Sequence, residues 1–281
     1  MTPLLFGDSA SPLFGVLHEP VPGTERGHGV LLCPPIGQEH VRTHWALRQV
    51  ATSLARAGHH VLRFDWFGVG DSTGDLADAT VGRWVEDART AAQELRDAAG
   101  LRRIAVLGLR FGATIAALAS AKIKPATLVL WDPVPSGAAH IAELSALHAG
   151  LLADTRRYWR RWPANVRKVV GRVFPDAAHE RALGTGQFVG FQFGAALRRE
   201  LVMVDAHTIT DVGSRRVVVI ESDSRPEIGA FAARLAEVGA SVERKPTEVR
   251  GRWNEPRQVE ELLLPADAVR IITEALDGRT A

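Results

Sequence analysis

The sequence has a single cysteine, Cys33, among its 281 residues. One cysteine cannot form an intrachain disulfide or supply the clustered thiolates of a zinc or iron–sulfur site. No stretch approaches the roughly 20 apolar residues that a membrane-spanning helix needs, and no charged N-terminal region leads into an apolar run. We therefore expect a cytoplasmic protein without a transmembrane segment or a metal site.

The sequence also has little net charge, with a formal value of +2. So small a net charge gives no reason to expect nucleic acid as a partner. Basic residues do gather in one run from Arg156 to Trp162, with Arg167, Lys168 and Arg172 after it. This run could contact an acidic carrier protein, a CoA-type phosphate or an anionic membrane surface. Alternatively, it is a helix whose arginines lie in water and whose tryptophans face inward.

Short apolar runs alternate with amphipathic segments along most of the chain. A first hairpin is expected at 4–6 and 13–18, and further strands at 29–33, 60–65, 104–107, 126–131, 217–220 and 242–245. A helix is expected where Trp45, Ala46, Val50 and Leu54 recur at near-helical spacing, closed by Gly58. Strands that alternate with helices along the chain predict an α/β fold with a mostly parallel central sheet flanked by helices.

The alternation stops between about residues 138 and 207. This segment is largely helical in pattern and offers no strong strand until residue 216. We interpret residues 138–207 as a helical cap inserted into an α/β core that consists of residues 1–137 and 208–281.

One stretch, Arg103 to Ser120, has the most informative pattern. A buried strand runs into Gly108-Leu109-Arg110-Phe111-Gly112, which is followed by a helix of small and apolar residues. Two glycines that bracket three residues between a strand and a helix are the layout of the nucleophile elbow, whose middle residue is held up at the sheet's edge in a strained turn. That middle residue is here Arg110.

Three further loops accompany this turn. Pro34-Pro35-Ile36-Gly37-Gln38-Glu39-His40 follows one strand, Asp65-Trp66-Phe67-Gly68-Val69-Gly70-Asp71-Ser72 follows the next, and Asp132-Pro133-Val134-Pro135-Ser136-Gly137 follows a fourth. The second loop lacks the spacing of a dinucleotide-binding loop. We therefore expect no nucleotide cofactor, and indeed no cofactor of any kind.

In this order, these loops and the Gly108–Gly112 turn resemble the α/β-hydrolase superfamily. Several stretches are more narrowly similar to the bacterial exosortase A system-associated hydrolases, especially the second type: Pro34-Pro35 with Glu39, Gly70-Asp71-Ser72 running into 75–79, Gly108 to Ala113, and Leu130 to Gly137. The similarity covers most of the core and little of the cap.

The resemblance implies an acyl-transfer site that requires a nucleophile, a histidine base, an orienting acid and backbone donors for an oxyanion. Arg110 stands at the nucleophile position and cannot attack a carbonyl, because its guanidinium stays protonated. The histidine should follow the last strand, but no histidine occurs after His207, and the loop there offers Trp253 instead. The acid position is filled by Asp223 or, one strand earlier, by Asp132.

The oxyanion hole could survive these changes. The resemblance assigns one donor to the N–H of Phe111 and the other to Ile36 or Gly37, since Pro34 and Pro35 have no N–H. A helix N-terminus with free amides is an anion site, and an arginine would add a full positive charge there.

Two interpretations of Arg110 remain open. It could bind a substrate carboxylate, phosphate or acyl oxygen, or it could be a structural ion pair with Glu39, Asp132 or Asp223. Glu39 and His40 could likewise form an acid/base pair, or simply belong to a solvated loop.

We therefore carry two hypotheses for function. In the first, an altered hydrolase-fold enzyme binds a molecule with a carboxylate, ester or thioester and promotes a reaction through Arg110 and the oxyanion region, with Asp132 and Trp253 contributing to binding. In the second, the protein is a non-catalytic accessory component. Both place it in a bacterial biosynthetic pathway such as exopolysaccharide or secondary-metabolite assembly.

Overall fold

An eight-stranded sheet forms the centre of the computed structural model, which describes residues 1–161, 163–173, 186–248, 253 and 266–277. The strand order is β1-β2-β4-β3-β5-β6-β9-β10. β1 and β2 form an antiparallel hairpin, β2 pairs antiparallel with β4, and all other neighbours are parallel. The strands are β1 Thr2–Phe6, β2 Leu13–His18, β3 Gly29–Cys33, β4 His60–Phe64, β5 Ile104–Leu109, β6 Thr127–Trp131, β9 Arg216–Glu221 and β10 Ser241–Pro246.

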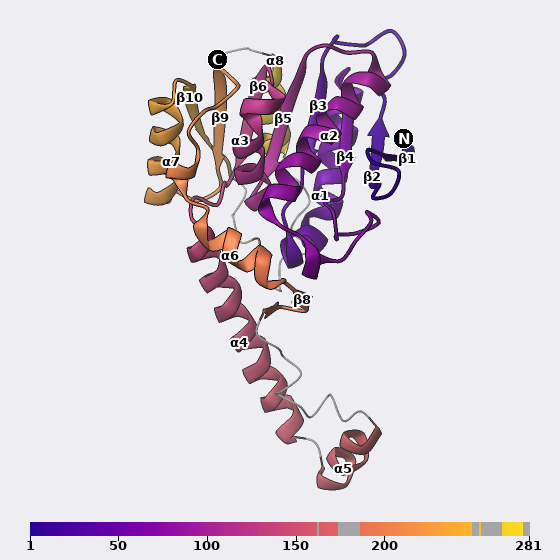
Figure 1. Cartoon of the computed structure of the whole chain (residues 1–281), viewed down its shortest axis with the longest axis vertical. Helices are drawn as coiled ribbons and strands as arrows, with labels where there is room; N and C mark the ends of the chain where they lie inside the picture. Colours follow the sequence, from indigo (N-terminus) through magenta and orange to yellow (C-terminus); the bar gives the residue numbers. More distant parts are fainter. Residues whose placement is uncertain (162, 174–185, 249–252, 254–265, 278–281) are drawn as a thin grey trace.

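Helices cover both faces of this sheet (Figure 1). Strand residues alternate between two apolar clusters, one shared with α1 and α8 and the other with α2, α3 and α7. The parallel strands are buried on both faces and therefore appear in the sequence as continuous apolar runs. The helices are α1 Gly37–Arg56, α2 Val81–Ala99, α3 Phe111–Ile123, α7 Pro226–Glu237 and α8 Ala266–Asp277, with a 3-10 turn, η1, at Leu76–Asp78. The predicted α/β class and its mostly parallel sheet are confirmed.

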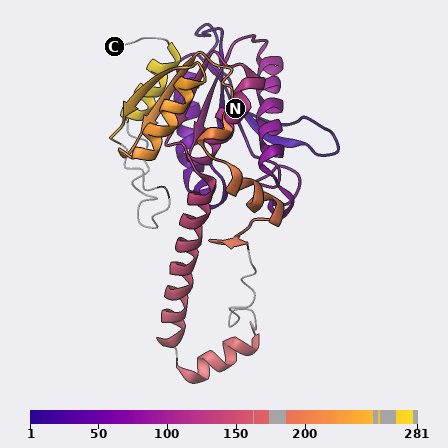
Figure 2. The ribbon, with the colours of Figure 1, turned by 60° about the vertical axis from the view of Figure 1, so that its left-hand side comes forward.

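The segment between β6 and β9 leaves the sheet. It contains α4 Gly137–Arg161, α5 Ala164–Val173, the hairpin β7 Gln187–Phe188 and β8 Phe191–Gln192, α6 Ala195–Met203 and η3 Ala206–Thr208. α4 extends away from the core and carries α5 near its far end (Figures 1 and 2). The hairpin was not expected in a segment predicted to be helical.

Two expectations for α1 were wrong. The helix begins at Gly37, so Glu39 and His40 lie in its first turns rather than in a loop. Trp45 is 56% exposed, although its spacing placed it with the buried residues Ala46, Val50 and Leu54. Gly58 does follow the helix end and has φ 99°, a conformation that glycine adopts without a steric cost.

Residues 156–161 of the basic run form the end of α4, whereas Trp162 lies outside the described residues. The side chains of residues 156–161, Arg167 and Arg172 are also outside the described part of the structure. Within the described residues no helix is long and apolar enough to span a bilayer.

Candidate functional site

The turn between β5 and α3 holds Arg110 in a rare backbone conformation. Its φ is 54° and its ψ is −126°, which a non-glycine residue adopts only where the surrounding structure enforces it. The Arg110 N–H donates to the carbonyl of Trp131 at 2.9 Å, so the turn is tied to the end of β6. This is the strained strand-to-helix turn that the glycine spacing predicted.

Close backbone contacts explain both glycines of the turn. A Cβ on Gly108 would lie 2.4 Å from the Cα of Ala113, and one on Gly112 would lie 2.1 Å from the carbonyl oxygen of Pro34. The start of α3 therefore packs directly on the loop after β3. The N–H of Phe111, as the first residue of α3, has no partner within the helix.

Arg110 is buried and ion-paired on two sides. Its Nε–H donates to Oε1 of Glu39 at 2.9 Å, and its Nη2 lies 3.4 Å from Oε2 of Glu143. Only 4% of the Arg110 side chain and none of the Glu39 side chain is exposed, whereas 46% of the Glu143 side chain is. Burial opposes the charge of Arg110, but Glu39 and Glu143 outweigh it and raise the pKa of the guanidinium. Arg110 is therefore a permanent cation that is already partnered.

A cavity of about 180 Å³ opens beside Arg110. Its lining combines charged and polar side chains with apolar ones. The lining residues are Arg110, Val134, Pro135, Ser136, Ala139, His140, Glu143, Arg225, Glu227 and Ile228. Sequence reasoning did not identify His140, Glu143 or Arg225 as site residues. His140 and Glu143 come from α4, whose position over the elbow depends on tertiary packing. Neither residue belongs to a local sequence pattern that indicates a binding site.

His140 has an unusual environment within this cavity. Its side chain is fully buried, its ring stacks on Phe111 with 5.8 Å between centroids, and neither ring nitrogen has a hydrogen-bond partner among the described residues. Its Nδ1 lies 3.8 Å from Oε2 of Glu143. Buried polar groups normally have partners, so a ligand-binding role is one explanation for these nitrogens.

Asp132 follows β6 and is completely buried, with φ 43°. Its Oδ1 accepts the N–H of Ser222 at 2.8 Å, and its Oδ2 accepts the indole N–H of Trp253 at 2.7 Å. Trp253 itself is only 3% exposed and packs edge-on against Trp131 at 5.3 Å. Asp132 and Trp253 thus form a buried pair, and neither is among the residues that line the Arg110 cavity.

Asp223 lies in an exposed position after β9 and is not among the residues that line the Arg110 cavity. Of the two candidate acids, Asp132 is the one that the structure places in a network with Trp253 and Arg225, whose Nη2 lies 3.8 Å from Asp132 Oδ1.

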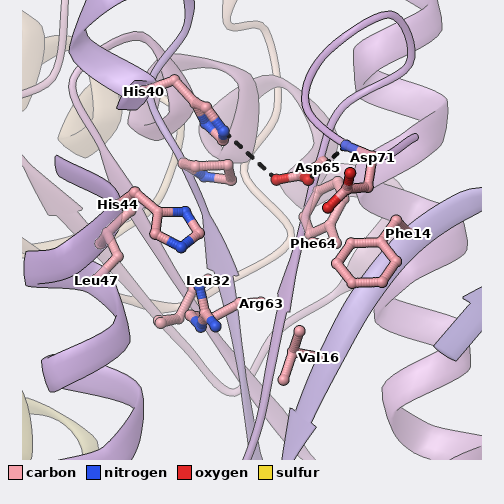
Figure 3. A pocket seen from close by; sticks show the side chains of 11 residues that line it. Phe14, Val16, Leu32, His40, His44, Leu47, Arg63, Phe64, Asp65 and Asp71 are labelled. Atoms are coloured by element: carbon pink, nitrogen blue, oxygen red, sulfur yellow. Dashed lines mark hydrogen bonds and ion pairs between the residues drawn. The ribbon is translucent and has the colours of Figure 1, made fainter. Parts of the chain in front are cut away.

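Glu39 and His40 are adjacent in sequence but face different partners. Whereas Glu39 contacts Arg110, the Nε2 of His40 lies 3.4 Å from Oδ1 of Asp65, and Figure 3 shows the two side chains pointing toward each other. Burial lowers the pKa of His40, and this effect exceeds the opposing influence of Asp65. The structure therefore does not bring Glu39 and His40 together as an acid/base pair.

His40 lines two hollows that are distinct from the Arg110 cavity. A small pocket of about 60 Å³ is lined in part by His40, Asp65 and Asp71 (Figure 3). An open groove of about 570 Å³ is lined in part by His40, Gly37 and Phe191. Ile36 and Gly37 were the two alternatives for the second oxyanion donor. Ile36 precedes α1 and is 2% exposed, whereas Gly37 lines the open groove.

Cys33 is buried at the end of β3, and burial strongly raises the pKa of its thiol. The described residues contain no cluster of three or more His, Cys, Asp or Glu suited to a metal ion.

A sequence model of the family described as "Serine aminopeptidase, S33" matches residues 39–217. No curated protein matches the chain. Similar solved structures include Est1E from Butyrivibrio proteoclasticus with bound ferulic acid, at TM-score 0.62 and 14% identity, where the alignment covers 98% of this chain and 99% of that one. An esterase from Pyrococcus furiosus aligns with TM-score 0.60 and 17% identity over 98% and 89% of the two chains. A lidless α/β serine hydrolase from Xanthomonas campestris aligns with TM-score 0.56 and 16% identity over 100% and 96%.

Proposed function

Because the chain belongs to the serine aminopeptidase S33 family and has the α/β-hydrolase fold, we propose that it is a member with a degenerate triad that binds a carboxylate-bearing small molecule beside Arg110. No serine acyl-enzyme forms. The observation that carries this proposal is the position of Arg110, which lies on the strained elbow and lines a cavity together with Arg225 and an apolar wall.

The neighbours of Asp132 support the loss of hydrolytic chemistry. A catalytic histidine would donate an N–H to the orienting acid and pass protons to and from the nucleophile. Here the indole of Trp253 donates to Asp132 at 2.7 Å. Indole is a donor only and cannot serve as a base. Together with Arg110 at the elbow, this arrangement retains the acid of a triad and replaces its two reacting members.

Binding to wild-type protein and to Arg110→Met/Glu39→Leu tests the proposal. The double variant removes the cation together with its buried partner, so no unpaired charge remains in the core. We expect wild-type protein to bind benzoate or butyrate in calorimetric titrations, and the folded double variant to lose most of that affinity. Equal binding by both proteins would exclude Arg110 as the recognition group.

A second candidate is catalysis of a non-classical reaction on an ester or thioester. The observation in its favour is the retained elbow, where the N–H of Phe111 has no intrahelical partner and could stabilise a developing oxyanion. Product formation that depends on Arg110 but resists fluorophosphonate treatment would favour this candidate over simple binding.

We also propose the wider setting from the motif resemblance. Residues 138–207 act as a cap over the site, and the protein works in the bacterial cytoplasm in a biosynthetic pathway of the kind that involves exosortase A system-associated hydrolases. The basic run from Arg156 to Trp162 is the candidate surface for an acidic carrier protein. Co-purification with the carrier proteins of the host tests this association.

A further inference from the structure

The contact between Arg110 and Glu143 differs from the other contacts of Arg110. At 3.4 Å it is longer than the 2.9 Å bond to Glu39, and the Glu143 side chain is 46% exposed while Glu39 is fully buried. Charge-assisted hydrogen bonds between guanidinium and carboxylate groups are normally about 2.7–2.9 Å long. The Glu143 contact is therefore weak, and its loss would leave Glu143 well hydrated.

The same cavity contains a second arginine with unmet hydrogen-bonding capacity. The Nε and Nη2 of Arg225 are buried without a hydrogen-bond partner in the described part of the chain, although Nη2 lies 3.8 Å from Asp132 Oδ1. Both ring nitrogens of His140 are likewise buried without a hydrogen-bond partner among the described residues. The residues that line this cavity thus include Arg225 and His140, whose buried nitrogen atoms find no hydrogen-bond partner among the described residues.

From these contacts we infer that Glu143 occupies the place of the ligand's carboxylate, and that the site selects small monoanionic carboxylic acids that displace Glu143. This inference rests on the proposed function and specifies its ligand class. Arg110 and Arg225 bind the incoming carboxylate, while Val134, Pro135 and Ile228 contact its short apolar body.

Charge balance favours a monoanion. Arg110 is already paired with Glu39, and Arg225 lies near Asp132. Exchange of Glu143 for one ligand carboxylate leaves the number of negative charges at the cavity unchanged. A dianion such as hydrogen phosphate would add an uncompensated charge beside buried carboxylates, which is costly in a low-dielectric environment.

The test compares the affinities of wild-type protein, Glu143→Gln and Glu237→Gln for benzoate, benzamide and inorganic phosphate. Glu237→Gln removes a negative charge from an exposed position on α7 that does not line the cavity. We expect Glu143→Gln to bind benzoate about tenfold more tightly than wild type, since a competing charge-assisted contact is removed. Glu237→Gln should change the affinity less than threefold, and benzamide and phosphate should bind at least tenfold more weakly than benzoate.

The outcomes separate the two proposals. If wild-type protein binds benzoate and Glu143→Gln binds it no better, or if benzamide or phosphate binds as well as benzoate, the inference about Glu143 and ligand class is overturned while the Arg110 pocket stands. If neither wild type nor Glu143→Gln binds benzoate or butyrate, both proposals are overturned. An Arg225→Gln variant provides a second readout and should weaken benzoate binding about tenfold.

Discussion

The Nε–H of Arg110 donates to Oε1 of Glu39 across 2.9 Å, in a pair whose side chains are 4% and 0% exposed. The two residues are 71 positions apart, and their contact joins the strained elbow to the first turn of α1. Removal of either side chain alone leaves the other as a buried charge without its 2.9 Å partner.

We expect Arg110→Met and Glu39→Leu to lower the free energy of unfolding by about 3–5 kcal/mol each. The double variant should lie much closer to wild type, because well-packed apolar side chains can replace a buried ion pair at little cost. Urea denaturation of the three variants measures this coupling. Additive losses in the double variant would show that the pair is not the source of the effect.

A serine restored at the elbow should not restore hydrolysis. Arg110→Ser supplies a nucleophile, but Trp253 still holds Asp132 and cannot accept a proton. We expect no fluorophosphonate labelling of wild type or of the single variant. Arg110→Ser/Trp253→His places an imidazole next to the acid and should become labelled at the introduced serine. Labelling of the wild-type protein at any serine would contradict the proposed absence of an acyl-enzyme.

The packing of the elbow predicts a large effect at Gly112. An added Cβ would lie 2.1 Å from the carbonyl oxygen of Pro34 and 2.5 Å from that of Cys33, and neither backbone atom can move away freely. Gly112→Ala should cost about 3 kcal/mol or more in unfolding free energy. Gly150→Ala is the matched control, because nothing lies within 4 Å of its added Cβ and the residue lies inside α4. It should cause no loss of stability.

His18 should make stability depend on pH. Burial, followed by the nearby charge of Arg63, lowers the pKa of His18 from 6.5 to about 4, and its neutral Nε2 accepts the Nε–H of Arg63. Between these values the unfolded chain takes up a proton that the native protein does not, so stability falls as the pH drops from about 6.5 to about 4. The loss should reach about 2–3 kcal/mol.

Thermal or urea unfolding across this pH range checks the contribution of His18. His18→Gln keeps an acceptor for Arg63 and should flatten the curve, whereas substitution of the exposed His207 should not. Equal slopes in wild type and His18→Gln would indicate that other groups are responsible.

The sequence alone predicted the central part of this protein well. Apolar runs located β2 and β3 at their observed bounds, and the other sheet strands differed by only one or two residues at an end. Strands buried on both faces produce such runs directly. Trp45 was the exception in α1, because helical periodicity alone does not say which residues at the margin of an apolar stripe remain exposed.

The candidate site was less predictable. The Gly108–Gly112 spacing identified the strained turn because glycines are required wherever another backbone comes within van der Waals distance. The partners of Arg110 were not determined by spacing. Glu39, Asp132 and Asp223 were equally open from sequence, and Glu143 and His140 were not considered.

The sequence by itself determined the α/β architecture, the absence of a serine at the elbow and the absence of a histidine after the last strand, since each depends on residue identity or local pattern. Only the tertiary structure decided that Glu39 neutralises Arg110, that Trp253 donates to Asp132 and that α4 brings Glu143 and His140 to the cavity. These contacts join segments far apart in the chain, and the packing of helices against the sheet sets their geometry.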